Sequence, residues 1–393
     1  MQIGILENLS EVLIYLDNYA TTPLDPRVLE GMMPFFKHEF GNASSTNHFG
    51  LSIKAIVEES REKVANLIGA SSSDIVFTSG ATESINIALK GFAIANAHKG
   101  KHLITCVSEH KAILETCKYL ETIGFDVTYL PVNNKGLIEL EGLEKAIRPD
   151  TILVTIMYVN NEIGVIQPIQ EIGNLTKKKG VIFMCDASQA VGKISINVND
   201  LGIDILTFSG HKYYGPKGIG CLFVKSLKRK DIKIAQTVHG GGHENGFRSG
   251  TLNVPAIVGL GISSEIANKE MKQNAQRILL MRDKLENELL KIPQAFVNGS
   301  TERRIYNVTN ICFPGVDASI VIGRLKNIAL SNGSACTSAV IEPSHVLKSI
   351  GLSYDDSLAS LRFSLGKFNT MSEVMLTAQI LQPLLNTSTS QYA

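Results

Sequence analysis

The chain has 393 residues, of which 44% are hydrophobic and 19% are charged. A chain of this length buries a large core and most naturally forms two domains, because single cores stop growing before this length. Lys and Arg total 38, Asp and Glu total 37, and the net charge is +1. This balance argues against direct binding of nucleic acid or of an acidic membrane surface.

The amino-terminal segment MQIGILENLSEVLIYLDN has no basic start and no small-residue cleavage site, and it carries Glu7 and Glu11. This composition argues against a secretory signal. No apolar run approaches the ~20 residues of a membrane span. The run ILVTIMYV has the length of a strand. We therefore expect a cytoplasmic protein with no membrane partner.

The six cysteines include no C-x-x-C pair, and five of them lie in apolar stretches that are typical of a core. Cys336 differs, because it lies in SNGSACTS, a run of glycine, alanine and hydroxyl residues. Free cysteine is usually an inert buried residue, but this composition favours a reactive thiol on a flexible loop. The histidine pairs 98/102 and 239/243 are not expected to share a helix face, so we predict no metal site.

From residue 74 onward, apolar strands alternate with amphipathic helices. Strands are expected at 74–80, 101–107, 126–132, 151–159, 181–186, 203–209 and 218–224, and helices at 81–99, 109–124, 138–147 and 168–180. This alternation predicts an α/β fold with a mainly parallel sheet covered on both faces.

The rest of the chain is looser. After TLNVPAIVGLGISSEIANKE, a long helical segment is expected to about Leu290, followed by short strands, short helices and a closing helix up to Leu385. This pattern predicts a smaller α+β domain. We expect a large domain at 14–260, and a small domain formed by 1–13 and 261–393 that carries the Cys336 loop.

Polar residues at strand ends are the candidates for a site, because ligands of open α/β sheets bind beyond the carboxyl ends of the strands. The stretch IVFTSGATES runs from a strand into a helix start, where free N–H groups, small residues and hydroxyls form a phosphate cradle. The alternative is an ordinary helix cap with a capping glutamate.

The stretch VIFMCDASQ places Asp186 directly after a strand and Gln189 three residues later. Asp186 could keep a heteroaromatic nitrogen protonated, and Gln189 could donate to a ring oxygen. The alternative is an Asp that only caps a helix or turn.

The stretch ILTFSGHKYYGPKGIG places Ser209, His211 and Lys212 between a strand and a rigid Gly-Pro turn. Such a lysine can form a Schiff base with an aldehyde cofactor. An ordinary lysine, with a pKa of ~10.4, is neutral in roughly one molecule in a few thousand at pH 7, and an imine solves this problem. The alternative is a solvated surface lysine.

Two further strand ends, in VSEHKAI and YVNNEIG, carry His110 and Asn161. An isolated histidine here is more often a satisfied core residue. Together, however, the junctions supply a phosphate cradle, a carboxylate for a ring nitrogen, a lysine for an imine and an aromatic lid. This combination predicts a site for pyridoxal 5'-phosphate.

The motifs YLDNYATTPLDPRV, GNASS, FTSGATESIN, VNNEIG, DASQAVGK, SGHKYYGPKGIG, GGGHENGFRSGT, SNGSACTS and RFSLG resemble, in order and spacing, those of cysteine desulfurases of the NifS/IscS type. These enzymes form part of the class V aminotransferase group. The resemblance spans Tyr15 to about Leu385. It implies the pyridoxal-phosphate transferase fold, similar to that of aspartate aminotransferase.

The resemblance also implies roles for single residues. Ala81, Thr82, Ser209 and His211 would bind the cofactor phosphate, His110 would stack on the ring, and Asn161 and Gln189 would contact the 3′ oxygen. Asp186 would pair with the ring nitrogen, and Lys212 would carry the cofactor. Thr251 would reach the phosphate of a neighbouring subunit, which implies a homodimer. Arg362, with Asn161, would bind the substrate, and Cys336 would accept sulfur.

The implied reaction converts L-cysteine into L-alanine and a persulfide on Cys336, which donates sulfur to an acceptor such as an iron–sulfur scaffold protein. The attacking species is a thiolate, and an unperturbed thiol with a pKa of ~8.5 is only about 3% ionised at pH 7. We expect a base near the cofactor, such as His110, to deprotonate Cys336.

Three other functions compete with this interpretation: an ordinary class V transaminase, a selenocysteine lyase and an idle sulfur-relay protein. A transaminase has no need of a thiol on a flexible loop, and an idle relative would be expected to have lost Lys212 or Asp186. The long segment after SNGSACTS favours group I desulfurases over group II.

About a dozen residues precede YLDN, and the end lacks the longer extension of housekeeping members, which bears on partner docking rather than on chemistry.

Overall fold

The computed structural model describes residues 13–227, 232–332 and 343–386. A seven-stranded sheet forms its larger part, in the order β2-β8-β7-β6-β5-β3-β4. Its strands are β2 (Ile75–Thr78), β3 (His102–Cys106), β4 (Asp126–Leu130), β5 (Thr151–Thr155), β6 (Ile182–Asp186), β7 (Ile205–Ser209) and β8 (Gly220–Val224). Strands β3 to β7 run parallel, and β8 is antiparallel to both β2 and β7. The predicted α/β class and mainly parallel sheet are confirmed.

The sheet is buried on both faces, as its continuous apolar strands predict. Side chains alternate along each strand, so that Ile75 and Phe77 of β2 enter one core while Val76 enters the other. The first core is covered by residues of α3, α7 and α8, and the second by residues of α4 and α5. These helices are α3 (His48–Leu67), α4 (Ala81–Asn96), α5 (Lys111–Thr122), α7 (Ile169–Lys179) and α8 (Val254–Leu289).

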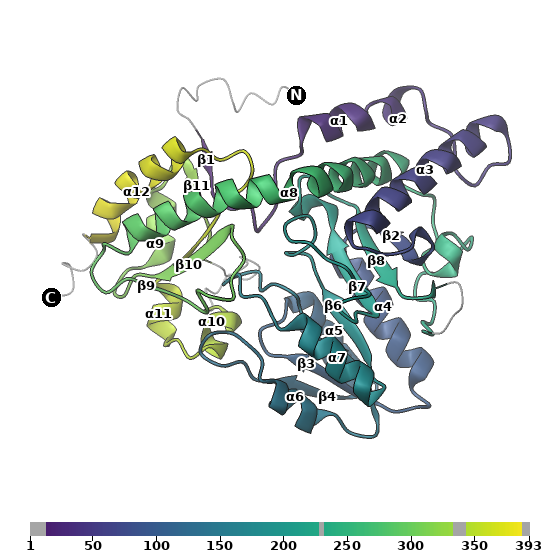
Figure 1. Cartoon of the computed structure of the whole chain (residues 1–393), viewed down its shortest axis with the longest axis horizontal. Coiled ribbons are helices and arrows are strands. Elements are labelled where there is room, and N and C mark those ends of the chain that lie inside the picture. The colour runs from purple at the N-terminus through teal and green to yellow at the C-terminus, as the bar shows by residue number, and fades with distance from the viewer. Residues whose placement is uncertain (1–12, 228–231, 333–342, 387–393) are drawn as a thin grey trace.

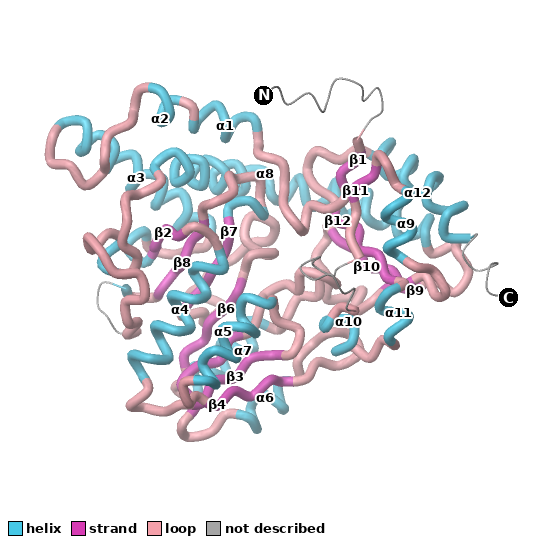
Figure 2. The backbone as a smooth tube through the Cα atoms, turned by 180° about the vertical axis from the view of Figure 1, so that it is seen from behind, coloured by secondary structure: helices cyan, strands magenta, loops and turns pink. Residues whose placement is uncertain are grey.

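The smaller part contains a three-stranded antiparallel sheet and a two-stranded parallel pair (Figure 2). Their strands are β9 (Phe296–Val297), β10 (Val308–Cys312), β12 (Ser360–Ser364), β1 (Ile14–Tyr15) and β11 (Ile328–Ala329). Strand β1 comes from the start of the described chain, yet it pairs with β11 and places Ile14 and Leu16 in the core of the smaller part. The amino-terminal segment therefore begins in the smaller part and then crosses to the large sheet.

The remaining helices are shorter or lie at the edges: α1 (Pro26–Met32), α2 (Pro34–Lys37), α6 (Leu140–Ala146), α9 (Ala318–Arg324), α10 (His345–Ser349), α11 (Tyr354–Leu358) and α12 (Met371–Asn386). Within the described ranges, none of the helices combines the length and the hydropathy that crossing a membrane requires.

Helix α8 joins the two parts, as Figure 1 shows. Its first half contributes Ile257 and Leu260 to a core of the large sheet, and its second half contributes Met281 and Leu285 to the core of the smaller part. The predicted boundary after residue 260 therefore falls inside a continuous helix, and we retain the division into 14–260 and 261–393 with 1–13 as a proposal.

A buried ion pair fixes the glycine-rich loop that precedes Thr251. Glu244 accepts from both Arg61 Nη1 and Arg61 Nη2 at 2.8 Å, and its Oε2 also accepts from the Phe77 backbone N–H at 2.7 Å. Arg61 lies on α3 and Phe77 on β2, so this carboxylate ties the loop to the large sheet. Glu244 has a φ of 50°. The anchor thus holds a backbone conformation that is uncommon outside glycine.

Replacing Arg61 with Met is expected to lower the free energy of unfolding by about 3–5 kcal/mol, because Glu244 would remain buried without its partner. Urea denaturation followed by circular dichroism measures this loss. The control is Lys63→Met on the same helix, which removes surface ion pairs with Glu59 and Glu265 and should cost about 1 kcal/mol or less. Equal losses in the two variants would show that the buried pair has no special weight.

Candidate active site

A cavity of ≈ 520 Å³, here called the large cavity, lies where the large sheet meets the amino-terminal segment and β12. Its volume is within the range of small-molecule sites. Most of the predicted site residues line it: Ala81, Thr82, His110, Asn161, Asp186, Gln189, Ser209, His211, Lys212 and Arg362. Thr251 is exposed and does not line it. Cys336 lies outside the described residues.

The start of α4 forms one wall. Its cap residue Gly80 has no side chain, and Glu83 Oε2 accepts from the Ser79 backbone N–H at 2.5 Å. Ser209 Oγ, at the end of β7, accepts from the Ala81 backbone N–H at 2.7 Å. The capping glutamate and the small-residue turn at a helix start are therefore both present. N–H groups of a first helical turn lack partners within the helix and favour an anion.

A close backbone approach brings this wall to Ser209. Gly220, the first residue of β8, pairs with both Thr78 and Ser209. A Cβ at Gly220 would lie 2.5 Å from Gly80 Cα. Only glycine fits there, so the Gly-Pro turn that leads into β8 also shapes the start of α4.

His110 caps α5 and lines the large cavity. Its Nδ1 accepts from the Ala112 backbone N–H at 3.1 Å, so a neutral imidazole carries its proton on Nε2. Burial and the positive charge of Lys212 lower the pKa of His110, whereas Asp186 opposes this shift. His110 is thus favoured in its neutral form, and it accepts a further proton only by giving up the cap hydrogen bond. Its predicted role as the base for Cys336 stays a prediction.

Asp186 ends β6 and is almost fully buried. Its Oδ1 accepts from the Ser188 backbone N–H at 2.9 Å and from Ser188 Oγ at 2.6 Å. The local turn that we considered as an alternative is therefore present, and the same residue also lines the large cavity.

Lys212 lies in a single 3₁₀ turn, Gly210–Lys212, directly after β7. Its Nζ donates to the backbone carbonyls of Tyr19 at 2.7 Å and of Ala20 at 2.9 Å. Burial, followed by the positive charge of Arg362, lowers the pKa of Lys212 to about 8, while Asp186 and Asp17 oppose the shift. It is not a solvated surface lysine, because its amine is held inside the large cavity.

In the protein without cofactor, labelling of Lys212 by an amine-specific reagent is expected to increase with a midpoint near its lowered pKa of about 8. An ordinary lysine would titrate near ~10.4. Arg362→Gln removes a positive charge, which favours the ammonium form, and should therefore move the midpoint upward. Quantitative mass spectrometry of the labelled peptide measures both values. A midpoint near that of exposed Lys145, measured in the same digest, would contradict the expectation.

Arg362 enters the large cavity from β12. Its Nη2 donates to Asp17 Oδ1 at 2.7 Å, and its Nη1 donates to the Asn161 backbone carbonyl at 2.7 Å. Among the described residues, Arg362 Nε and Asn161 Oδ1 are buried without a hydrogen-bond partner. Buried polar atoms are usually paired, so this pair of atoms marks a place for a polar ligand.

Reasoning from strand ends did not single out Asp17 or Tyr19. Asp17 pairs with Arg362, and the Tyr19 carbonyl accepts from Lys212 and also from Gln189 Nε2 at 3.0 Å. Both residues lie in the motif YLDNYATTPLDPRV, and the resemblance of this motif to the desulfurases was the signal that could have identified them. Residues in a segment that crosses between the two parts of the molecule do not follow a strand of the large sheet, so a search of strand ends cannot find them.

Glu109 was also missed. It is fully buried, and its Oε1 accepts from the Met157 backbone N–H at 2.5 Å. Burial, and then the charge of Asp186, raise the pKa of Glu109 well above its ordinary value. Because Met157 follows β5, this carboxyl group ties the end of β3 to the segment that leads to Asn161.

Both described flanks of the segment that carries Cys336 contact the site. Before it, Ser331 lines the large cavity and pairs with the backbone of Arg362. After it, Ser344 Oγ donates to Glu162, and His345 Nε2 lies 2.9 Å from the Glu109 backbone carbonyl. The other five cysteines, 106, 117, 185, 221 and 312, are buried, and burial raises the pKa of each.

The sequence matches the family model described as "Aminotransferase class-V" over residues 14–376. It is 48% identical over 363 residues to "Cysteine desulfurase IscS" of Rickettsia prowazekii, which covers 92% of this chain and 88% of that protein. It is 49% identical over 371 residues to "Probable cysteine desulfurase, mitochondrial" of Dictyostelium discoideum, which covers 94% of this chain and 82% of that protein.

Solved structures agree with these relatives. A "NIFS-LIKE PROTEIN" superposes with a TM-score of 0.89 and 38% identity, and covers 96% of this chain and 100% of that chain. A structure described as "SspA in complex with cysteine" superposes with a TM-score of 0.81 and 38% identity, and covers 91% of this chain and 100% of that chain.

Proposed function

The chain belongs to the class V aminotransferase family, with cysteine desulfurases among its relatives, and we propose that it acts as a cysteine desulfurase. The reaction takes sulfur from L-cysteine, leaves L-alanine and forms a persulfide on Cys336. The observation that carries the proposal is the large cavity, which gathers a helix start, a buried carboxylate, a lysine of lowered pKa and an arginine with an unpaired N–H.

The residues of the large cavity fit pyridoxal 5'-phosphate, on which the family depends. The unpartnered Asn161 Oδ1 and Arg362 Nε call for polar ligand atoms. When bound, pyridoxal phosphate supplies an aldehyde that bonds to amines and a ring that accepts an electron pair from the substrate carbon. The residues that would hold it are Ala81, Thr82, Ser209 and His211 at the phosphate, His110 on the ring face, Asn161 and Gln189 at the ring oxygen, Asp186 at the ring nitrogen, and Lys212 at the aldehyde.

Lys212 is the group that moves the proton of the substrate carbon. With a pKa of about 8, its amine is neutral in roughly a tenth of molecules at pH 7, far more often than an ordinary lysine. Asp186 would be the charge partner of the ring nitrogen when the cofactor is bound. The lowered pKa therefore keeps a useful fraction of Lys212 in the neutral form that can accept a proton.

Arg362 binds the carboxylate of L-cysteine. Its two Nη groups are held by Asp17 and by the Asn161 carbonyl, which fixes the plane of the guanidinium. Its Nε is unpartnered and can donate to a carboxylate oxygen. Asp17 thus acts as a brace for the substrate arginine.

Cys336 receives the sulfur. Its thiolate attacks the substrate sulfur, a new S–S bond forms and the substrate C–S bond breaks. The electron pair of that bond stays with the carbon skeleton, which takes up a proton and leaves as L-alanine. Five extended residues span at most about 17 Å, so the chain length between Ser331 and Cys336 allows the thiol to reach the large cavity.

The protein is proposed to act as a homodimer. Thr251 is exposed and does not line the large cavity of its own chain, which is consistent with contact to the phosphate of a second subunit. Its loop is firmly anchored by Glu244 to Arg61 and by Arg248 to Glu83.

The persulfide is proposed to pass to an acceptor in the cytoplasm, such as a scaffold protein for iron–sulfur cluster assembly.

Cys336→Ala is expected to keep the visible absorbance of the bound cofactor but to lose alanine formation from L-cysteine. The reason is that the cofactor contacts lie on other residues, whereas sulfur has no acceptor. Amino-acid analysis of single and multiple turnovers measures alanine, and mass spectrometry after alkylation detects the persulfide on the wild-type Cys336 peptide. Cys117→Ala, at a buried thiol, is the matched control and should remain active. Undiminished turnover of Cys336→Ala would falsify the sulfur-acceptor assignment.

Lys212→Ala is expected to lower turnover at least several hundredfold, because both the covalent bond to the cofactor and the catalytic base are lost. Borohydride should then no longer attach the cofactor to the chain, whereas it should attach it in wild type. Lys217→Ala, an exposed lysine five residues away, serves as the control. Reduction that still labels the Lys212-containing peptide in the variant would refute the assignment.

A further inference from the structure

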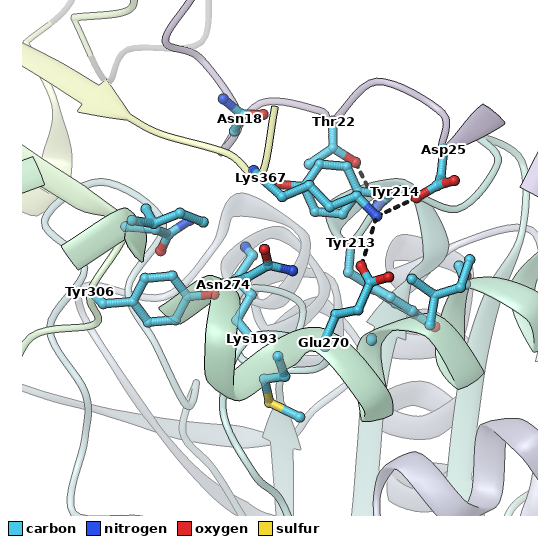
Figure 3. Close-up of a pocket in the computed structure, with 17 residues that line it drawn as sticks. Asn18, Thr22, Asp25, Lys193, Tyr213, Tyr214, Glu270, Asn274, Tyr306 and Lys367 are labelled. Carbon is cyan, nitrogen blue, oxygen red and sulfur yellow. Dashed lines mark hydrogen bonds and ion pairs between the residues drawn. The ribbon is translucent and has the colours of Figure 1, made fainter. Parts of the chain in front are cut away.

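Lys193 is a buried lysine in the wall between two cavities. It lines a small cavity of ≈ 30 Å³ together with Asn274, Tyr306 and Tyr213 (Figure 3). Its Nζ donates to Gln189 Oε1 at 2.6 Å, and Gln189 lines the large cavity. Lys193 therefore lies on the far side of Gln189 from the large cavity and contacts the candidate active site through the Gln189 side chain.

The burial of Lys193 is costly. The residue is 6% exposed, and across the described ranges no carboxylate forms an ion pair with it. Its Nζ lies 4.6 Å from the centre of the Tyr19 ring. Burial, followed by the positive charges of Lys212 and Arg362, lowers the pKa of Lys193 well below its ordinary value. A methionine of similar length would fill this space at lower cost, so packing alone does not account for the amine.

The Gln189 amide is held between the Lys193 amine and the Tyr19 carbonyl. Gln189 Nε2 donates to the Tyr19 carbonyl at 3.0 Å, and Gln189 Oε1 accepts from Lys193. A carbonyl can only accept, and a lysine amine is a donor in either charge state. Rotation of the amide by half a turn would place two acceptors together at Tyr19, whereas at Lys193 it would oppose donors only in the ammonium form, because a neutral amine also has a lone pair that accepts. The Tyr19 carbonyl therefore sets the orientation, and the hydrogen bond from Lys193 reinforces it.

The same carbonyl connects this amide to the lysine of the site. Tyr19 O accepts from Lys212 Nζ at 2.7 Å as well as from Gln189. A continuous series of hydrogen bonds therefore runs from Lys193 through Gln189 and Tyr19 to Lys212. A change at Lys193 is transmitted first to the amide that faces the large cavity.

We propose that Lys193 is a positioning residue: by donating to Gln189 Oε1, it holds the amide nitrogen toward the large cavity and leaves its second N–H for the ring oxygen of the bound cofactor. This inference rests on the proposed function. An N–H that donates to this oxygen stabilises its negative charge, which weakens its hold on a neighbouring proton. Correct placement of the amide thus lowers the pKa of the bound chromophore.

The test is a pH titration of the visible absorption band of the holoenzyme. Lys193→Met should move the midpoint upward by about one pH unit, which is tenfold in proton affinity. Lys193→Arg keeps a hydrogen-bond donor, and the small cavity offers space for the larger guanidinium. This variant should therefore keep the wild-type midpoint. In Lys193→Met, kcat should decrease severalfold while KM for L-cysteine stays near wild type, because Arg362 is untouched.

A double-mutant cycle separates positioning from a merely structural effect. In a Gln189→Leu background, Lys193→Met should give no further shift of the midpoint, because the amide that it positions is gone. An additive shift would overturn the proposal. Should Lys193→Met fail to fold, Lys193→Gln decides, since its shorter side chain ends before Gln189 and should give the same upward shift.

The outcomes distinguish this inference from the function on which it rests. A wild-type protein that shows no visible band after incubation with pyridoxal phosphate would overturn the proposed function, and this inference with it. A wild-type band that titrates normally, together with an unchanged midpoint in Lys193→Met, would overturn only the role of Lys193.

Discussion

The parallel pairing of β3, β5, β6 and β7 is the constraint on which the site depends. Neighbouring parallel strands end at the same edge of a sheet, so residues that follow them in sequence meet in space even when they lie a hundred residues apart. His110 follows β3, Asn161 follows β5, Asp186 ends β6 and Lys212 follows β7. The large cavity exists because these four ends coincide.

A second set of contacts completes the site from outside the sheet. The amino-terminal segment begins beside β11 in the smaller part and then crosses to the large sheet, where the Tyr19 carbonyl accepts from Lys212 and Gln189. On the way, Asp17 pairs with Arg362 of β12. Lys212 and Arg362, the proposed catalytic lysine and the proposed substrate-binding arginine, are therefore held by residues only two positions apart.

Charge is unevenly distributed in this site. Lys212, Arg362 and Lys193 lie close enough for positive charge to lower the pKa of the two lysines, while Asp17 and Asp186 oppose the shift at Lys212. The result is a lysine with a pKa of about 8 at the large cavity and a buried lysine behind it. Both depend on burial first, so the same packing that shapes the large cavity also adjusts its chemistry.

The sequence by itself determined the α/β class, the strands and helices of the large sheet and the residues at their ends. Periodic apolar runs and Gly-Pro turns are local signals, and strand-end logic needs only chain order. The tertiary structure decided what no local signal contains: that the Tyr19 carbonyl meets Lys212, that Asp17 braces Arg362, that His110 uses Nδ1 to cap α5, and that α8 crosses the predicted domain boundary. These depend on segments distant in sequence that pack together, or on the rotamer of one side chain, and on the burial that follows. The pKa of Lys212 follows from that burial, and composition alone does not contain it.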